Sequence, residues 1–321
     1  MAAQVERAER IERWSWSRYG TPLALVVMMV VFALVNPAFL SARNLSQTLR
    51  QGAILFLIVS GQALTIVIRG IDLSQGSVMS LVSVATISSI YVLGAYWGSL
   101  AGVLFGGLCG FVNGMLIGYL HIPPIVATLG MLFVTLGVEL VYTGGVTLTN
   151  LTDIDQGRLF WFGGGMVGPL PVPVVFAIII GLILHYMLRS TEFGRHIYFM
   201  GANPVAARMV GVKANRVTVI VYTLSGLLAA LGAFFLTARL SMGCPYLGEG
   251  WLVISIGGAV VGGISILGGE GGIWEAVLGT LVIVFLENGL IVSGVSSFAR
   301  EAILGCIIIL ACMASVIRRR S

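Results

Sequence analysis

An uncharged run sets the strongest limit on what this chain can fold into. Residues 73–138 contain no aspartate, glutamate, lysine or arginine. A helix needs about 20 apolar residues to cross the roughly 30 Å hydrocarbon core of a bilayer, so this run is long enough for several crossings. Of all 321 residues, 58% are hydrophobic and only 10% are charged, whereas soluble domains average about 25% charged. The sequence therefore predicts an all-α integral membrane protein.

Charged clusters and helix-breaking residues divide the chain into about ten transmembrane helices. Asn36 and Pro37 end the first helix, because proline disfavours helical geometry in the residue before it. Glycine, proline and aromatic residues at 94–98 and 121–124 mark the turns inside the uncharged run. The expected spans are 19–42, 51–68, three between 73 and 138, 171–188, 217–238, 251–267, 273–292 and 301–317.

The basic residues predict the topology of these spans. With ten spans and a cytoplasmic N-terminus, 13 of the 18 basic residues lie on the cytoplasmic side, which is the bias that the positive-inside rule describes. The cytoplasmic set is Arg7, Arg10, Arg13, Arg18, Arg69, Arg189, Arg195, Arg208, Lys213, Arg216, Arg318, Arg319 and Arg320. Both termini are therefore expected in the cytoplasm. The domain organisation is an N-terminal interfacial or solvated segment at 1–18, one transmembrane domain at 19–317 and a basic tail at 318–321.

Several classes of function lack support. The glycine-rich stretch 257–272 is not followed by Gly-Lys-Ser/Thr, so no P-loop for a nucleotide is expected. The three histidines are far apart and have no cysteine cluster beside them, so neither a metal site nor a catalytic triad is expected. The net charge of +5 reflects topology, and nothing indicates a nucleic-acid partner.

Glycine recurs at every fourth position of the expected fourth span. The positions are Gly102, Gly106, Gly110, Gly114 and Gly118. Such a row lets the backbone of another helix approach closely. We expect this face to pack against protein, with direct contact to a transported solute as the alternative.

The longest basic loop, 189–216, contains a segment with the signals of a complete short helix. Asn203 suits the N-cap, Pro204 suits the first helical position and Gly211 suits the left-handed residue beyond the end. Two small residues, Ala206 and Ala207, lie between these ends. The pattern predicts a docking element for a cytoplasmic partner, with a surface of small residues into which the partner fits.

This loop segment resembles the coupling loop of ABC importer permeases, whose motif also contains Ala-Ala, three residues and Gly. From residue 36 to 317 the sequence is similar to the permease subunits of the ribose, xylose and galactose class of ABC importers. The matching segments, in chain order, are 36–40 (NPAFL), 44–45, 70–77 (GIDLSQGS), 127–131, 193–198, 201–211, 225–229, 262–265, 279–281 and 288–290.

The resemblance implies the permease subunit of an importer for a sugar or sugar-like polyol in the bacterial inner membrane. The implied partners are a second permease subunit, identical or paralogous, a cytoplasmic subunit that binds ATP and magnesium, and a periplasmic or lipid-anchored solute-binding protein. No cofactor is expected in this chain. The residues implied in coupling to the ATPase are Glu192, Arg195, Asn203, Pro204, Ala206, Ala207, Arg208 and Gly211.

An ion-gradient-driven secondary transporter is the alternative. Glu139, Glu275 and Glu287 could then be sites for the coupling ion. This interpretation explains carboxylates in the spans, but it does not explain a capped cytoplasmic helix.

Polar residues within apolar spans are the candidates for the translocation pathway. Placing a polar side chain in hydrocarbon costs free energy, so such residues usually have a functional or structural role. The candidates are Gln62, Asp72, Ser74, Asn113, Thr128, Glu139 and Asn288. Each has a structural alternative. Asp72 could form an interfacial ion pair with Arg69 or act in gating, and the neutral side chains could bind solute or join neighbouring helices.

Overall fold

The computed structural model describes residues 20–320, with side chains as far as Met313. The N-terminal segment 1–18 and the side chains of the tail 318–321 lie outside the described part. After a first helix at Gly20–Val35, the helices are η1 (Pro37–Leu40), α2 (Ala42–Val67), α3 (Gln75–Gly118), α4 (Pro124–Thr143), α5 (Asp153–Gly164), α6 (Val172–Ser190), α7 (Glu192–Ala202), α8 (Pro204–Met209), α9 (Ala214–Leu240), α10 (Trp251–Gly262), α11 (Ile273–Val292) and α12 (Ser297–Arg320).

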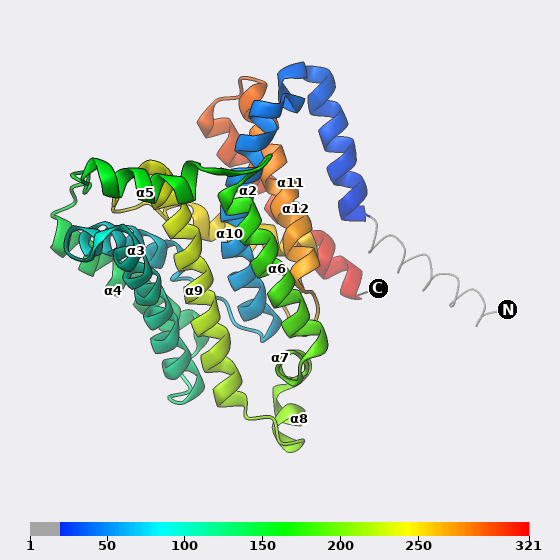
Figure 1. Ribbon diagram of the computed structural model, residues 1–321. Coiled ribbons are helices and arrows are strands. Elements are labelled where there is room, and N and C mark those ends of the chain that lie inside the picture. Colours follow the sequence, from blue (N-terminus) through cyan, green and yellow to red (C-terminus); the bar gives the residue numbers. More distant parts are fainter. Residues whose placement is uncertain (1–19, 321) are drawn as a thin grey trace.

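Six of these helices are long and apolar enough to cross a bilayer, namely α2, α3, α4, α6, α9 and α11. The fold is therefore that of an all-α membrane protein, as the hydropathy predicts. Helix α2 lies at the centre and is almost completely buried, with α9, α6, α10 and α11 packed around it. Figure 1 shows α3 and α4 on one flank of this centre and α11, α12 and the Gly20–Val35 helix on the other.

Helix α3 is two antiparallel segments joined at Gly94. This glycine has φ 75° and ψ 172°, which breaks the helix at the position that the sequence indicates. A side chain at Gly98 would meet the Ile90 backbone, and one at Gly102 would meet Thr86, so the two segments lie side by side. The uncharged run 73–138 thus forms three apolar helical segments, two in α3 and one in α4.

Helix α10 differs from the expected span at 251–267. It has 12 residues, which at 1.5 Å per residue make about 18 Å, too short to cross the hydrocarbon core. The helix ends because Gly263 adopts a left-handed conformation with φ 107°. Residues 263–272 then form a glycine-rich loop that returns the chain to α11. Hydropathy alone gave no sign of this early end, because residues 264–267 are also mainly apolar.

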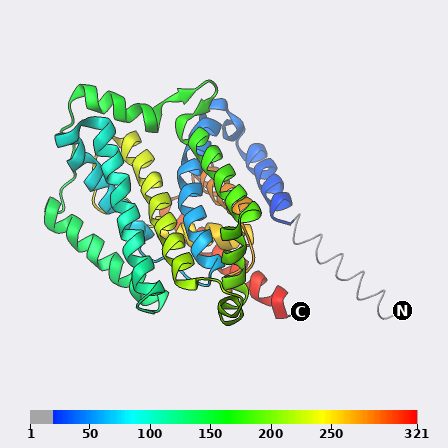
Figure 2. The ribbon, with the colours of Figure 1, turned by 60° about the horizontal axis from the view of Figure 1, so that its bottom comes forward.

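The two ends of the helix bundle carry different short elements. At one end, α5 lies across the bundle and contacts α9, α3 and α6 (Figures 1 and 2). Beside it is a hairpin of β1 (Met166–Val167) and β2 (Leu170–Pro171), in which Met166 pairs with Pro171 and Val167 with Leu170. At the opposite end lie α7 and α8.

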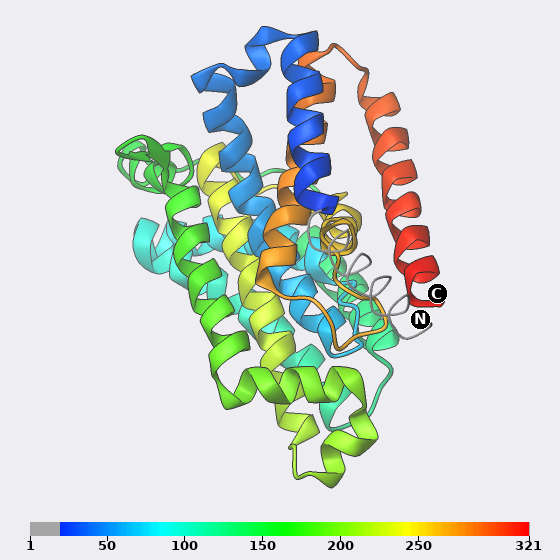
Figure 3. The same ribbon diagram turned by 90° about the vertical axis from the view of Figure 1, so that its right-hand side faces the viewer.

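The first and last helices lie at the edge of the bundle (Figure 3). Asn36 caps η1 and donates a hydrogen bond of 3.0 Å to the Val292 carbonyl, which fixes the end of the first helix against α11. Helix α12 packs beside α10 and α11.

Candidate functional site: a loop element connected to a buried polar network

Helix α8 forms where the sequence predicts it, because both of its ends have suitable residues. The Asn203 side chain accepts hydrogen bonds from the backbone N–H groups of Val205 and Ala206 at 3.0 and 3.1 Å. Pro204 is the first helical residue. Gly211, just beyond the end, has φ 87°, a conformation that favours glycine.

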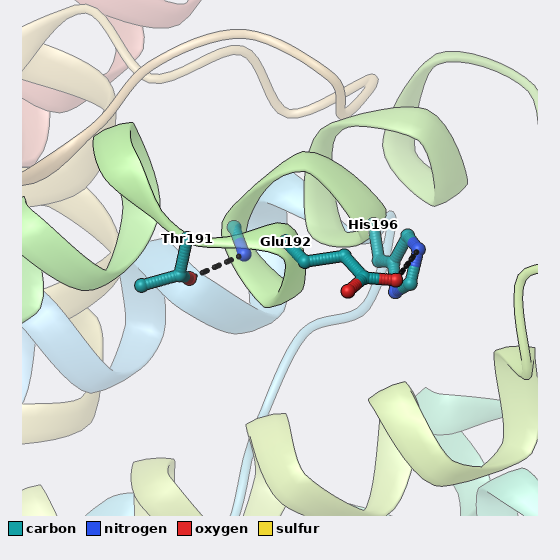
Figure 4. Close-up of polar contacts among 4 residues, drawn as sticks. Thr191, Glu192 and His196 are labelled. Atoms are coloured by element: carbon teal, nitrogen blue, oxygen red, sulfur yellow. Dashed lines mark hydrogen bonds and ion pairs between the residues drawn. The ribbon is translucent and has the colours of Figure 1, made fainter.

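Helix α7, which precedes α8, is a further helix that the sequence analysis did not identify. Thr191 caps it by accepting a hydrogen bond from the Gly194 N–H at 3.1 Å. Figure 4 shows Glu192 in the first turn with its Oε1 3.5 Å from Nε2 of His196. A threonine cap followed by an acidic residue is a sequence signal for a helix start, so α7 could have been predicted.

The α7–α8 element carries an exposed cluster of apolar side chains. Val205, Met209 and Val210 are 71%, 84% and 73% exposed, and Phe199 at the end of α7 is 53% exposed. Ala207 is only 2% exposed and belongs to the hydrophobic core. The expectation that Ala207 offers a surface to a partner is therefore wrong, because this face of α8 packs inward. Of the other implied coupling residues, Pro204 is half-buried and the rest are exposed, namely Glu192, Arg195, Asn203, Ala206, Arg208 and Gly211.

Arg69 connects the end of α2 to this element. Its Nε and Nη2 donate hydrogen bonds of 2.6 and 2.5 Å to the carbonyl groups of Gly201 and Ala202. Within the described residues Arg69 forms no ion pair with Asp72. That alternative is wrong, because Arg69 extends toward the last turn of α7 while Asp72 turns into the protein.

The glycine-rich loop 263–272 contacts the same element. The Tyr198 hydroxyl donates a hydrogen bond of 2.8 Å to the Gly271 carbonyl. Burial, assisted by the charge of Glu275, raises the pKa of Tyr198, so the phenol keeps the proton that it donates. The Gly269 N–H donates to the Val67 carbonyl at 2.9 Å, and a side chain at Gly201 would collide with both Val67 and Gly269. The end of α2, α7 and this loop therefore meet at backbone contact distance.

A buried network of polar side chains begins three residues after Arg69. Asp72 Oδ1 accepts hydrogen bonds from the backbone N–H and the hydroxyl of Ser74 at 3.0 and 2.6 Å. Its Oδ2 accepts a hydrogen bond from the Ser225 hydroxyl on α9 at 2.8 Å. Asn113 donates to the Ser74 hydroxyl at 2.9 Å. Three predicted pathway residues, Asp72, Ser74 and Asn113, therefore lie together.

Gln75 extends this network to α10. Its Nε2 donates to the Ser225 hydroxyl at 2.9 Å, and its Oε1 lies 3.2 Å from the hydroxyl of Ser255, which also donates to the Leu252 carbonyl at 2.8 Å. The sequence analysis missed Gln75, Ser225 and Ser255 as site residues. Their polarity within apolar segments was the available signal, but nothing in the sequence indicated that they meet.

The comparisons with known proteins decide the family. The family described as "Branched-chain amino acid transport system / permease component" matches residues 44–312. The chain belongs to this family of permeases. Among its relatives, the ribose import permease of Escherichia coli strain K12 is 35% identical over 291 residues, which cover 90% of each chain.

Two more relatives agree with this assignment. The ribose import permease of Bacillus subtilis strain 168 is 37% identical over 296 residues, covering 92% of this chain and 91% of the relative. The D-allose transport system permease protein of Escherichia coli strain K12 is 31% identical over 300 residues, covering 92% and 90%. No solved structure matches the chain.

The other predicted pathway residues of the permease lie apart from the Asp72 network or at its edge. Thr128 donates to the Pro124 carbonyl at 2.9 Å and lies 3.3 Å from the Ile71 carbonyl, next to the network. Gln62 and Glu139 are fully buried, and their side-chain polar atoms have no hydrogen-bond partner among the described residues. Asn288 exchanges two hydrogen bonds with Asn44, of 2.7 and 3.0 Å, and thereby joins α11 to α2. The roles of these residues in solute passage remain predictions.

The glycine row of the permease forms the contact between α3 and α9. All five glycines are buried. Side chains added at Gly106, Gly110, Gly114 and Gly118 would meet backbone or Cβ atoms of α9, and one at Gly102 would meet Thr86 in the first segment of α3. The row is thus a packing face within this chain, and a larger residue there would push two helix backbones apart.

Proposed function

We propose that this permease is the membrane-spanning subunit of an ATP-driven importer for a sugar or sugar-like polyol. The observation that carries the proposal is the α7–α8 element, which has exposed apolar side chains and is hydrogen-bonded through Arg69 to the end of α2 and through Tyr198 to the glycine-rich loop 263–272. The relatives support the solute class, since they are named as permeases for ribose import and D-allose transport.

We further propose ten spans in the bacterial inner membrane, with both termini in the cytoplasm. Ten apolar segments support this count: the Gly20–Val35 helix, α2, the two segments of α3, α4, α6, α9, α10, α11 and α12. In this proposal α10 and the loop after it enter the membrane without forming a full-length helix. In Figure 3 the beginning of the first helix and the end of α12 both point toward the side that carries α7 and α8, which supports a common side for the termini.

Each proposed partner of the permease has a separate role in transport. A cytoplasmic subunit binds ATP and magnesium and docks on the face formed by Val205, Met209 and Val210. A second permease subunit, identical or paralogous, completes the pathway, and a periplasmic or lipid-anchored protein delivers the solute. The chain itself contributes alternating access and no chemistry.

Coupling requires that the ATPase bind α7–α8 differently in its two states, because a contact of equal affinity in both states shifts no equilibrium. A movement of this element would act on Arg69 and the glycine-rich loop. The loop 68–74 would then transmit it to Asp72 and to the polar network on α9, α3 and α10. This route gives one path from the cytoplasmic face to the interior.

Co-purification with the ATPase tests the docking face. Val205→Asp combined with Met209→Asp should keep the protein folded, because both side chains are largely exposed, but should abolish stable association with the ATPase. Loss of a buried interface anchor costs about 2 kcal/mol, equivalent to roughly 30-fold in affinity. Val146→Asp, at the opposite end and 65% exposed, is the control. Unchanged association of the double variant would contradict this face as the docking site.

A further inference from the structure

An apolar groove runs along α6 between α2 and α11. Its volume is about 450 Å³, and small residues leave the space, among them Gly52, Ala177 and Gly181. The polar groups among its lining side chains are those of His185, Trp274 and Thr280, and the Thr280 hydroxyl donates to the carbonyl of Ala276 in its own helix at 2.7 Å. The groove therefore offers almost no hydrogen bonds and fits a hydrocarbon chain.

The groove is long and ends at the cytoplasmic end of α6. Its lining residues on α6 run from Val174 to His185, which at 1.5 Å per residue is about 16 Å. Leu182 on its wall is 65% exposed, so the groove is open along the side of the bundle. Figure 1 shows α2, α6 and α11 side by side, with α7 directly below α6.

A polar pocket of about 710 Å³ continues the groove at this end. The two cavities share His185, Ile273 and Trp274. The pocket is also lined by Arg189 from the last turn of α6 and Arg195 from α7. An apolar groove that opens into a basic pocket fits a phospholipid, because the acyl chain can lie in the groove and the headgroup in the pocket.

The charge of the pocket favours an anion. Arg189 and Arg195 are exposed, and neither forms an ion pair with an acidic side chain in the part of the chain that the structure describes. Glu275 also lines the pocket, so the pocket has two guanidinium groups and one carboxylate and is net positive. Arginine suits a phosphate because its planar group donates two parallel hydrogen bonds.

We propose that this groove and pocket bind one anionic phospholipid of the cytoplasmic leaflet. An acyl chain lies in the groove against Ala177 and Gly181, and the phosphate lies between Arg189 and Arg195. Trp274 is at the junction, where an aromatic ring at headgroup depth is favourable. Basic pockets at the cytoplasmic ends of membrane helices attract anionic headgroups in this way. The lipid would contact α7, and so the site is next to the proposed coupling element without depending on it.

Native mass spectrometry of the full chain in detergent tests the site. Phosphatidylglycerol and phosphatidylcholine with the same acyl chains are offered in equal amounts, and we expect phosphatidylglycerol to be retained preferentially. In the variant Arg189→Gln with Arg195→Gln, this preference should fall about fivefold for each arginine. Lys213→Gln with Arg216→Gln makes the same change in net charge at two exposed positions outside the pocket and should leave the preference unchanged.

A second variant tests the groove. Gly181→Leu would place its side chain within about 3 Å of the Phe56 ring and fill the groove, so it should lower retention of phosphatidylglycerol without a change in charge. The proposal is overturned if the wild type retains both lipids equally, or if the two pairs of basic-residue variants behave alike. Competition by millimolar inorganic phosphate as effective as that by phosphatidylglycerol would also overturn it, since the groove would then contribute nothing.

Discussion

The Asp72 carboxylate accepts a hydrogen bond of 2.8 Å from the Ser225 hydroxyl, although 153 residues separate the two in the chain. The bond joins the loop between α2 and α3 to the middle of α9. Arg69, at the start of the same loop, bonds to the carbonyl groups at the end of α7. A few residues of backbone thus contact both the α7–α8 element and the buried polar network.

Loss of the Ser225 hydroxyl should destabilise the protein. Ser225→Ala leaves one carboxyl oxygen of Asp72 without its buried donor, and a buried polar group left without a partner costs about 1–3 kcal/mol. Thr223→Ala on the same helix is the matched control, because among the described residues the Thr223 hydroxyl bonds only to the Val219 carbonyl of its own helix. Thermal unfolding in detergent should show a clear loss for Ser225→Ala and a small one for Thr223→Ala. Equal losses would mean that the Asp72 contact contributes little.

Arg69 should be needed for coupling more than for folding. In Arg69→Lys the charge is kept, but the rigid fork in which Nε and Nη2 each bond to a separate carbonyl, of Gly201 and Ala202, is lost because lysine has one nitrogen on a flexible stem. We expect normal membrane insertion and ATPase association, with ATP-driven uptake reduced about tenfold or more, which corresponds to at least about 1.4 kcal/mol. Arg216→Lys, at an exposed position in the first turn of α9, should transport normally. Full uptake by Arg69→Lys would exclude this connection from coupling.

The packing face of α3 should not tolerate a methyl group. A Cβ atom at Gly110 would collide with the Tyr222 carbonyl in the α9 backbone, whereas one at Gly130 on α4 has open space around it. Gly110→Ala should therefore destabilise by about 1–3 kcal/mol, and Gly130→Ala should be neutral or slightly stabilising because alanine favours the helix. Thermal unfolding of the two variants in detergent gives the comparison. The same stability for both would show that α3 and α9 can separate freely.

The proposed topology predicts which sites an impermeant thiol reagent can reach. In a cysteine-free background, Asn150→Cys in the loop before α5 should be labelled from outside intact cells, and Lys213→Cys before α9 only after the membrane is opened. Both positions are exposed in the structure. Lys213 suits the reporter better than its neighbour Ala214, which is buried. Labelling of Lys213→Cys from outside would reverse the orientation.

Local signals in the sequence were enough for much of the fold. Gly94 broke the uncharged run where expected, and Asn203 and Gly211 set the ends of α8, because caps and left-handed residues act within a few positions of the chain. Helix α5 was missed because residues 153–164 combine two aspartates and an arginine with aromatic residues and show no long apolar run.

The contacts that define the site could not be predicted, because they depend on how distant segments pack. Nothing near Asp72 in the sequence distinguishes a bond to Ser225 from an ion pair with Arg69. The burial of Ala207 likewise depends on the angle at which α8 lies against the core, and a short capped helix can present any face to the partner. The family resemblance, in contrast, extended over most of the chain, and the comparisons confirm it.

Solute uptake by reconstituted vesicles tests the central claim most directly. The permease is placed in proteoliposomes with the proposed ATPase and binding-protein partners, and uptake of labelled ribose is followed with and without ATP on the ATPase side. The account predicts uptake that requires ATP, persists when ionophores remove all ion gradients, and is lost in Val205→Asp with Met209→Asp. Uptake that continues without ATP and collapses with the ion gradient would contradict the account and identify a secondary transporter.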